Sequence, residues 1–326
     1  MKTGQGGGRA EAPRVSIAIP LFDEEEGLPE LLRRVTAVLD ALPGEGHELV
    51  LVDDGSADRT MEILARAAGE DPRIVAVSLS RNFGHQAALT AALEFVTGDV
   101  IVLMDGDLQD APELIPTMLE RMREGYDVVY ARRDRRLEAW WLRVAYFAYY
   151  RILSAVSNLQ LPLDAGDYAA ISSRALRAIR SAPERHRYLR GLRAWAGFRQ
   201  IGLPVERAAR YTGRSKYSLR KLLRLASDGI FSFSIIPLRL AAALGAVTVL
   251  LTTLFALFAL YARLVLDRSP QGFTALILVM TLVSGVNLLF LGIIGEYVGR
   301  VYEEVKGRPL YVVQRVVRGR DGSEPT

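Results

Sequence analysis

Short apolar runs alternate with longer amphipathic runs from Val15 to about Arg133. The apolar runs, such as VSIAIPLF and DVIVLMD, are nearly continuous Val, Ile and Leu, which is typical of strands buried on both faces. The amphipathic runs, such as GLPELLRRVTAVLDAL, have helical spacing. Strands that alternate with helices predict an α/β domain whose mainly parallel sheet is covered on both faces. Ligands of such sheets bind beyond the carboxyl ends of the strands.

Two later stretches, residues 240–262 and 273–295, contain no charged side chain. As helices they are each about 35 Å long, enough to cross a hydrocarbon core of about 30 Å. Buried core helices are the alternative, which uninterrupted apolar runs of this length disfavour. Lys and Arg residues gather before the first stretch and after the second, whereas the connecting segment carries only Arg263, Asp267 and Arg268. The positive-inside rule therefore predicts two membrane spans, with the N-terminal domain and the C-terminal tail in the cytoplasm.

Two further segments have the composition of helices that lie in the membrane interface. Residues 137–158 interleave Trp, Tyr and Phe with arginines, and residues 218–234 are basic and amphipathic and lead into the first apolar stretch. Interfacial helices beside a membrane anchor have this pattern. For residues 137–158 an ordinary helix packed on the sheet is the alternative. The predicted organisation is a disordered tail at 1–13, a catalytic domain with these helices at 14–234, two spans within 235–298 and a cytoplasmic tail at 299–326.

The amino-acid composition excludes several kinds of reactive and metal-binding site. The 326 residues include no cysteine, which excludes disulfides, thiolate metal sites and cysteine nucleophiles and fits a reducing compartment. The net charge of +4 says little by itself, because the basic residues are clustered beside the apolar stretches. The first 13 residues are rich in glycine and lack the apolar stretch of a signal peptide.

Acidic residues follow two of the predicted strands. Asp53 and Asp54 end one, and Asp105, Asp107 and Asp110 end another. On an extended strand, residues two apart face the same side, so Asp105 and Asp107 are expected to aim at one point. Paired carboxylates suit Mg²⁺ or Mn²⁺ and the phosphate oxygens of a substrate, although a simple Asp-Gly turn is the alternative. Asp110 precedes a proline and is expected to cap a helix.

The basic stretch at residues 210–224, RYTGRSKYSLRKLLR, lies just before the first predicted span. Arg210 and Lys216 are candidates for binding a lipid phosphate at the bilayer surface. Plain attraction to anionic lipid explains Arg220, Lys221 and Arg224 equally well.

A series of motifs that occur in order resembles the polyprenyl-phosphate glycosyltransferases of glycosyltransferase family 2, a group that includes bactoprenol glucosyltransferases and dolichol-phosphate mannose synthases. The resemblance covers about residues 14–312, and the combination of the last three motifs points to the lipid-phosphate branch. The motifs are IPLFDEEEGL, VDDGSADRT, SRNFGHQAAL, MDGDLQDAPE, DAGDY, RGL, GRSKY, SFSIIPLRL and GIIGEYVGRVYEEVKGRP.

This resemblance implies a GT-A type of nucleotide-binding domain and an inverting transfer of sugar from a nucleotide sugar to polyprenyl phosphate at the cytoplasmic membrane face. UDP-glucose is the first candidate donor, with GDP-mannose or a modified UDP-sugar as alternatives. A homo-oligomer, such as a tetramer, is implied as well. The residues that the resemblance assigns are Pro20, Asp53 and Asp105 to the nucleotide pocket, Asp105 and Asp107 with Gln109 to Mg²⁺ or Mn²⁺, Asp167 and Asp107 to catalysis, and Arg133, Arg210 and Lys216 to phosphate.

Some positions depart from the family pattern. Asp23 stands where Asn is frequent in the family. Ala169 stands where an arginine often follows the Asp-aromatic pair, which is Asp167-Tyr168 in this chain. The three histidines, His47, His85 and His186, show no ligand spacing and are interpreted as structural, although His85 lies near the start of a helix and could approach the site.

The attacking phosphate monoester has a second pKa of about 6, so a strong general base is hardly needed. We therefore expect Asp167 to position a basic residue or a sugar hydroxyl.

Two other readings compete with a lipid-linked sugar transferase. A sugar nucleotidyltransferase also uses an α/β sheet and a carboxylate-bound metal, but it ordinarily begins with a glycine-rich basic loop, where this chain has the acidic IPLFDEEEGL. A non-catalytic membrane protein that scaffolds or translocates lipid-linked sugars is the second alternative. Two spans are few for a translocation path, and the presence of Asp105, Asp107 and Asp167 together favours an enzyme.

Overall fold

The computed structural model describes residues 12–133, 165–185, 187–205, 236–265 and 272–319. These fall into two compact units. The first holds the sheet and its covering helices, and the second holds the two long apolar helices. The predicted tail at 1–13 lies mostly outside the described residues, and so do the two predicted interfacial helices at 137–158 and 218–234.

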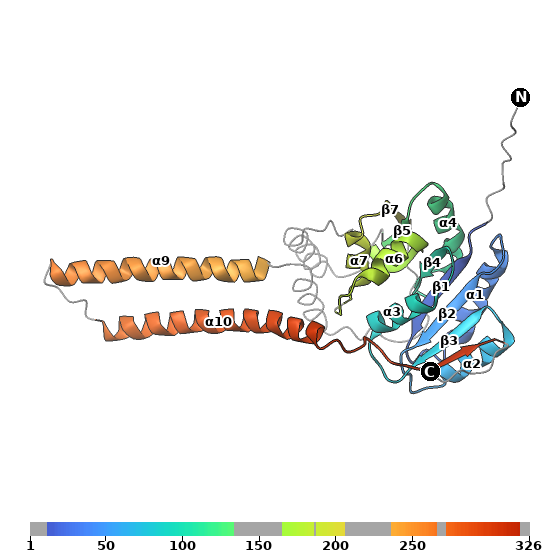
Figure 1. The fold of residues 1–326 in the computed structure, drawn as a ribbon, viewed down its shortest axis with the longest axis horizontal. Coiled ribbons are helices and arrows are strands. Elements are labelled where there is room, and N and C mark those ends of the chain that lie inside the picture. Colours follow the sequence, from blue (N-terminus) through green and yellow to red (C-terminus); the bar gives the residue numbers. More distant parts are fainter. Residues whose placement is uncertain (1–11, 134–164, 186, 206–235, 266–271, 320–326) are drawn as a thin grey trace, which may run out of the picture. The chain divides into compact units, whose positions relative to one another are not determined.

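The first unit is built on an eight-stranded mixed sheet with the order β7-β5-β6-β4-β1-β2-β3-β8 (Figure 1). Four of its seven neighbouring pairs are parallel. The predicted α/β architecture with a mainly parallel sheet is therefore confirmed. The strands are β1 (Val15–Leu21), β2 (Glu48–Asp53), β3 (Ile74–Leu79), β4 (Val100–Leu103), β5 (Val128–Arg133), β6 (Ala165–Ser172), β7 (Gln200–Val205) and β8 (Val313–Arg318).

Helices cover both faces of the sheet. Successive residues of a strand point to opposite faces, so Ile17 and Ile19 of β1 enter one hydrophobic cluster and Ala18 enters the other. Side chains of α1, α2 and α4 pack in the first cluster, and those of α3, α6 and α7 in the second. The helices are α1 (Leu28–Ala41), α2 (Thr60–Glu70), α3 (His85–Phe95), the short 3-10 helix η1 (Pro112–Leu114), α4 (Ile115–Arg123), α6 (Ser173–Ser181) and α7 (Leu189–Trp195).

Two antiparallel additions lie outside the alternation seen in the sequence. β6 runs antiparallel to β4, between β4 and β5. β8 pairs antiparallel with β3, with Val77 opposite Val316, and completes one edge of the sheet. Residues 299–326 were expected to form a tail, but this stretch supplies a strand of the first unit.

The second unit contains α9 (Ile236–Leu264) and α10 (Phe273–Val305), which run alongside each other (Figure 1). A Cβ at Gly245 of α9 would lie 3.2 Å from the ring of Phe290, so glycine allows the two helices to approach closely. Residues Leu238–Ala262 and Val279–Val305 are long and apolar enough to cross a membrane, and most of their apolar side chains are exposed and not buried. The alternative of buried core helices therefore does not describe this unit.

Candidate active site

The register of two strands brings the central acids together. β4 and β6 pair antiparallel, with Leu103 opposite Ala169. Continuing this register by two residues puts Asp105, just after β4, opposite Asp167, near the start of β6. β1, β2, β3 and β4 are parallel, so their carboxyl ends lie at the same end of the sheet. α3 follows β3 and begins with His85, which therefore lies at that end as well. Three side chains that are far apart in sequence are thereby neighbours in space.

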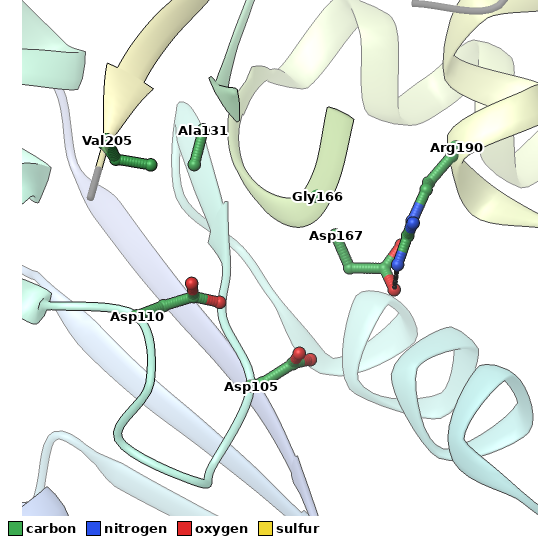
Figure 2. Close-up of a pocket in the computed structure, with 7 residues that line it drawn as sticks. All are labelled: Asp105, Asp110, Ala131, Gly166, Asp167, Arg190 and Val205. Atoms are coloured by element: carbon green, nitrogen blue, oxygen red, sulfur yellow. Dashed lines mark hydrogen bonds and ion pairs between the residues drawn. The ribbon is translucent and has the colours of Figure 1, made fainter. Parts of the chain in front are cut away.

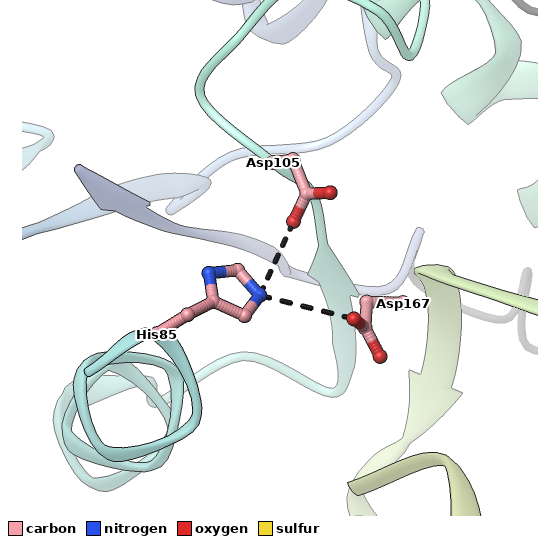
Figure 3. Close-up of side chains that lie close together, drawn as sticks. All are labelled: His85, Asp105 and Asp167. Atoms are coloured by element: carbon pink, nitrogen blue, oxygen red, sulfur yellow. Dashed lines mark ion pairs between the residues drawn. The ribbon is translucent and has the colours of Figure 1, made fainter. Parts of the chain in front are cut away.

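His85 lies between the two carboxylates, as Figure 3 shows. Its Nε2 atom is 3.5 Å from Oδ1 of Asp105 and 3.8 Å from Oδ2 of Asp167. One ligand atom from each residue falls within 4.8 Å of the others, an arrangement that could hold a metal ion. Burial alone would lower the pKa of His85, but hydrogen bonding to Asp167 and the charge of Asp105 raise it. The interpretation of His85 as a structural residue missed this position.

Asp167 is held by an arginine on α7. Arg190 donates from Nε and Nη2 to the two carboxylate oxygens, at 2.7 and 2.8 Å (Figure 2). The Asp167 side chain is only 7% exposed. Burial would raise its pKa, but the charge and hydrogen bonds of Arg190 hold the pKa of Asp167 well below its usual range. Asp167 is therefore an ionised carboxylate with a fixed orientation.

The loop after β4 differs from the extended strand that was predicted. β4 ends at Leu103, and Leu108 adopts a left-handed backbone with φ of 58°. Asp107 accepts a hydrogen bond from the backbone N–H of Gln109 at 3.1 Å, which is a turn contact. Asp105 and Asp107 therefore do not share the face of a strand, and Asp107 is not a member of the cluster formed by Asp105, Asp167 and His85.

The glycine in this loop serves packing. A Cβ at Gly106 would lie 2.4 Å from Cδ2 of Leu21 and 3.3 Å from the carbonyl oxygen of Pro20. The room that the missing side chain leaves is thus filled by β1.

A pocket opens between this loop and the strands β5, β6 and β7. Its lining residues are Asp105, Asp110, Ala131, Gly166, Asp167, Arg190 and Val205 (Figure 2). Asp110 was expected to cap a helix, but the residue before η1 is Ala111, and no side chain caps that helix. The capping prediction is wrong because the left-handed turn at Leu108 redirects the chain and sends Asp110 into the pocket.

The carboxylates of Asp53 and Asp54, at the end of β2, accept hydrogen bonds from groups of the protein itself. Asp54 is 3% exposed and accepts the backbone N–H groups of Phe83 and Gly84 at 2.8 and 2.9 Å. Asp53 is 2% exposed and accepts the N–H of Ser56 at 3.2 Å. Burial raises the pKa of both carboxyls, and these hydrogen bonds oppose that rise. Since Gly84 precedes α3, Asp54 fixes the start of the helix that carries His85.

Two of the residues assigned to the nucleotide lie outside the pocket. Pro20 is buried in β1 opposite Val52, and neither Pro20 nor Asp53 lines the pocket. The backbone of Arg133 ends β5. Its side chain, Arg210 and Lys216 lie outside the part of the chain that is described.

Asp23, which stands where Asn is frequent in the family, forms hydrogen bonds to the loop that follows β2. Its Oδ1 accepts the N–H of Ala57 at 2.9 Å, and its own N–H donates to Oγ of Ser56 at 2.9 Å. An Asn side chain also offers an oxygen acceptor, so this departure from the family pattern keeps the contact between the loops that follow β1 and β2.

Known proteins resemble this chain over nearly its whole length. The family model for glycosyl transferase family 2 matches residues 16–180. An uncharacterized glycosyltransferase of Bacillus subtilis is 41% identical over 301 residues, 92% of this chain and 93% of the relative. An undecaprenyl-phosphate 4-deoxy-4-formamido-L-arabinose transferase of Edwardsiella ictaluri is 36% identical, covering 95% and 96% of the two chains. A prophage-derived bactoprenol glucosyl transferase of Shigella flexneri is 34% identical, covering 94% and 99%.

The match to the family model includes β1 to β6 and therefore the cluster of His85, Asp105 and Asp167. The relatives extend the likeness to the two apolar helices, which lie beyond that model. The mixed sheet is the GT-A type of fold that the resemblance implied. This chain belongs to glycosyl transferase family 2 and is a glycosyltransferase.

Proposed function

We propose that this protein transfers a sugar from a nucleotide sugar to polyprenyl phosphate, with inversion at the anomeric carbon and UDP-glucose as the first candidate donor. The observation that carries the proposal is the convergence of Asp105, Asp167 and Arg190 on one pocket at the carboxyl end of β4. The names of two relatives, a bactoprenol glucosyl transferase and an undecaprenyl-phosphate sugar transferase, support a polyprenyl phosphate acceptor. Because these relatives move different sugars, GDP-mannose and modified UDP-sugars remain alternative donors.

The position of Asp105 fits a divalent metal ion. Asp105 belongs both to the observed cluster with His85 and to the set that the family resemblance assigns with Asp107 and Gln109. Carboxylate and amide oxygens suit Mg²⁺ and Mn²⁺. We infer that Asp105 and Asp107 hold one of these ions, with Gln109 as a further ligand. When bound, the ion would offset the negative charge that develops on the departing nucleoside diphosphate.

The ion pair of Asp167 and Arg190 supports a positioning role for the carboxylate. A phosphate monoester acceptor is largely a dianion at neutral pH, so its oxygen attacks without losing a proton to the enzyme. Arg190 presents a planar cation that suits phosphate, and Asp167 fixes its orientation through two hydrogen bonds. In this account Asp167 aligns Arg190 for the anionic groups of the reaction.

Substitution of Asp167 tests this account. Asp167→Asn removes the charge and one acceptor, and we expect transfer to fall modestly while its pH profile stays unchanged. Arg190→Lys keeps the charge but cannot form the two parallel hydrogen bonds, so its effect should be similar. Near-total loss of activity in Asp167→Asn that is rescued at high pH would instead identify Asp167 as a general base.

The whole reaction is tested with purified protein, polyprenyl phosphate, Mg²⁺ or Mn²⁺, and a panel of radiolabelled sugar nucleotides. Transfer should move label into the extracted lipid phase with one preferred donor, and Asp105→Asn should abolish it. If no donor delivers label to lipid, and none releases nucleoside diphosphate, the proposed reaction is wrong.

We further propose that α9 and α10 span the membrane and that the catalytic domain faces the cytoplasm. The apolar, exposed surfaces of both helices and the basic residues beside them support this placement. The chain contains no cysteine, so single cysteines can be introduced without background. In intact cells, a membrane-impermeant maleimide should label Ser269→Cys, between the helices, and should not label Ser323→Cys. The reverse labelling would invert the proposed orientation.

A further inference from the structure

Asp110 is a pocket residue with no part in the reaction described above. We propose that the Asp110 carboxylate hydrogen-bonds hydroxyl groups of the sugar being transferred and so helps to determine which nucleotide sugar is accepted. This inference rests on the proposed function and deepens it by assigning a specificity residue.

The position of Asp110 is fixed from both sides in the chain. Upstream, Leu108 is 4% exposed and its left-handed backbone turns the loop back toward the sheet. Downstream, the carbonyl oxygen of Ala111 accepts a hydrogen bond at 2.8 Å from the hydroxyl of Tyr168, which is 1% exposed. Tyr168 follows Asp167 in β6, so the same strand positions both acids. A carboxylate on a loop anchored in this way is preorganised for a ligand.

The pocket has sides of different character. Asp110 extends into it from the side opposite the Asp167–Arg190 pair, with Asp105 between them (Figure 2). Among the described residues that line the pocket, Arg190 is the cationic one, and it forms a hydrogen-bonded ion pair with Asp167. A carboxylate accepts hydrogen bonds through its two oxygens, so the side of Asp110 suits a ligand that offers hydroxyl donors.

Small or apolar groups of Ala131, Gly166 and Val205 form the remaining walls of the pocket. A pyranose ring offers C–H groups to such a wall and hydroxyl donors to a carboxylate, which accepts through two oxygens. Of the residues assigned to the nucleotide pocket, Asp105 lines this pocket, whereas Pro20 and Asp53 do not. The transferred sugar is thus the part of the donor whose chemistry fits Asp110.

The test compares ligands that differ only in the sugar. Calorimetric titration of the purified full-length protein with Mn²⁺ measures the affinities for UDP and UDP-glucose, and for GDP and GDP-mannose. For the preferred pair, Asp110→Ala should weaken sugar nucleotide binding by about tenfold or more, the amount expected for loss of a hydrogen bond to a charged group. Binding of the nucleoside diphosphate should stay within about twofold of the wild type, and this also shows that the variant is folded.

Two further variants sharpen the comparison. Asp110→Asn keeps the shape and one oxygen acceptor, so it should lose less affinity than Asp110→Ala and should change the relative rates with different donors. Glu113→Gln is the matched control, because Glu113 lies three residues away, pairs with Arg34 at 2.6 Å and does not line the pocket. It should leave both affinities and donor preference unchanged.

The outcomes separate this inference from the proposed function. If Asp110→Ala weakens nucleoside diphosphate and sugar nucleotide equally, Asp110 acts on the metal or the diphosphate, and the sugar contact is refuted. If it changes neither affinity nor donor preference, the inference is refuted as well, while sugar transfer by the wild type keeps the proposed function. If the wild type neither binds nor uses any sugar nucleotide, both proposals fall.

Discussion

Asp54 offers a direct measurement of how the site is held in place. In Asp54→Asn, the single side-chain oxygen can accept only one of the N–H groups of Phe83 and Gly84, and the amide NH₂ faces the other. A buried N–H without an acceptor costs about 1–3 kcal/mol. The Asn side chain also removes a buried charge, whose cost is reflected in the raised pKa of Asp54, and this offsets part of the loss. We therefore expect local opening at residues 83–84 to become easier by about 2 kcal/mol.

Hydrogen exchange followed by mass spectrometry reports this opening in the full-length protein. An easing of about 2 kcal/mol corresponds to about 30-fold faster exchange of the amides of Phe83 and Gly84. Asp58→Asn is a matched control, because Asp58 also accepts two backbone N–H groups, from Glu25 and Thr60, but is partly exposed so that water can replace it. Unchanged exchange at 83–84 in Asp54→Asn, or an equal increase there in Asp58→Asn, would refute this account.

Three further predictions follow from single contacts. Tyr168→Phe removes the hydrogen bond to Ala111 and should lower stability by about 1 kcal/mol, seen as a fall of a few degrees in the thermal unfolding midpoint; no shift would show that the bond is not needed. Gly55→Ala should express poorly or unfold early, since its φ is 70° and a Cβ would lie 2.4 Å from the backbone carbon of Arg81; a wild-type midpoint would contradict this. Chelation of divalent metal should abolish sugar transfer, and Mg²⁺ or Mn²⁺ should restore it, whereas persistent transfer in the chelator would argue against a required ion.

Much of the fold could be predicted because its strands and helices follow local patterns. The apolar run that includes Ile17 and Ile19 is buried in β1, and the charge-free stretches lie in α9 and α10 as expected. The convergence of Asp105 with Asp167 could be expected only from the family resemblance, since it depends on an antiparallel pairing between segments about 60 residues apart.

The errors in the site come from backbone geometry and long-range packing. The Asp-Gly dipeptide at 105–106 left a turn open as the alternative, but nothing in the pattern favoured the left-handed backbone of Leu108, and Asp110 lies in the pocket instead of at a helix cap. His85 carried one usable signal, its place at the start of a helix that follows a parallel strand, where ligands gather. Arg190 was seen within a family motif, but its partner Asp167 could be recognised only in three dimensions.

The pairing of β8 with β3 limits how the chain can be threaded through a bilayer. β7 ends at Val205 and β8 begins at Val313, and both strands belong to one sheet. One sheet lies on one side of a membrane, so the chain between these strands must cross an even number of times. If α9 inserted and α10 did not, β8 would lie on the opposite side of the membrane from the rest of the sheet. The edge of β3 would then have no partner strand and could pair with other chains. If α9 and α10 span the membrane as proposed above, completion of the sheet is therefore a check that both helices have been inserted.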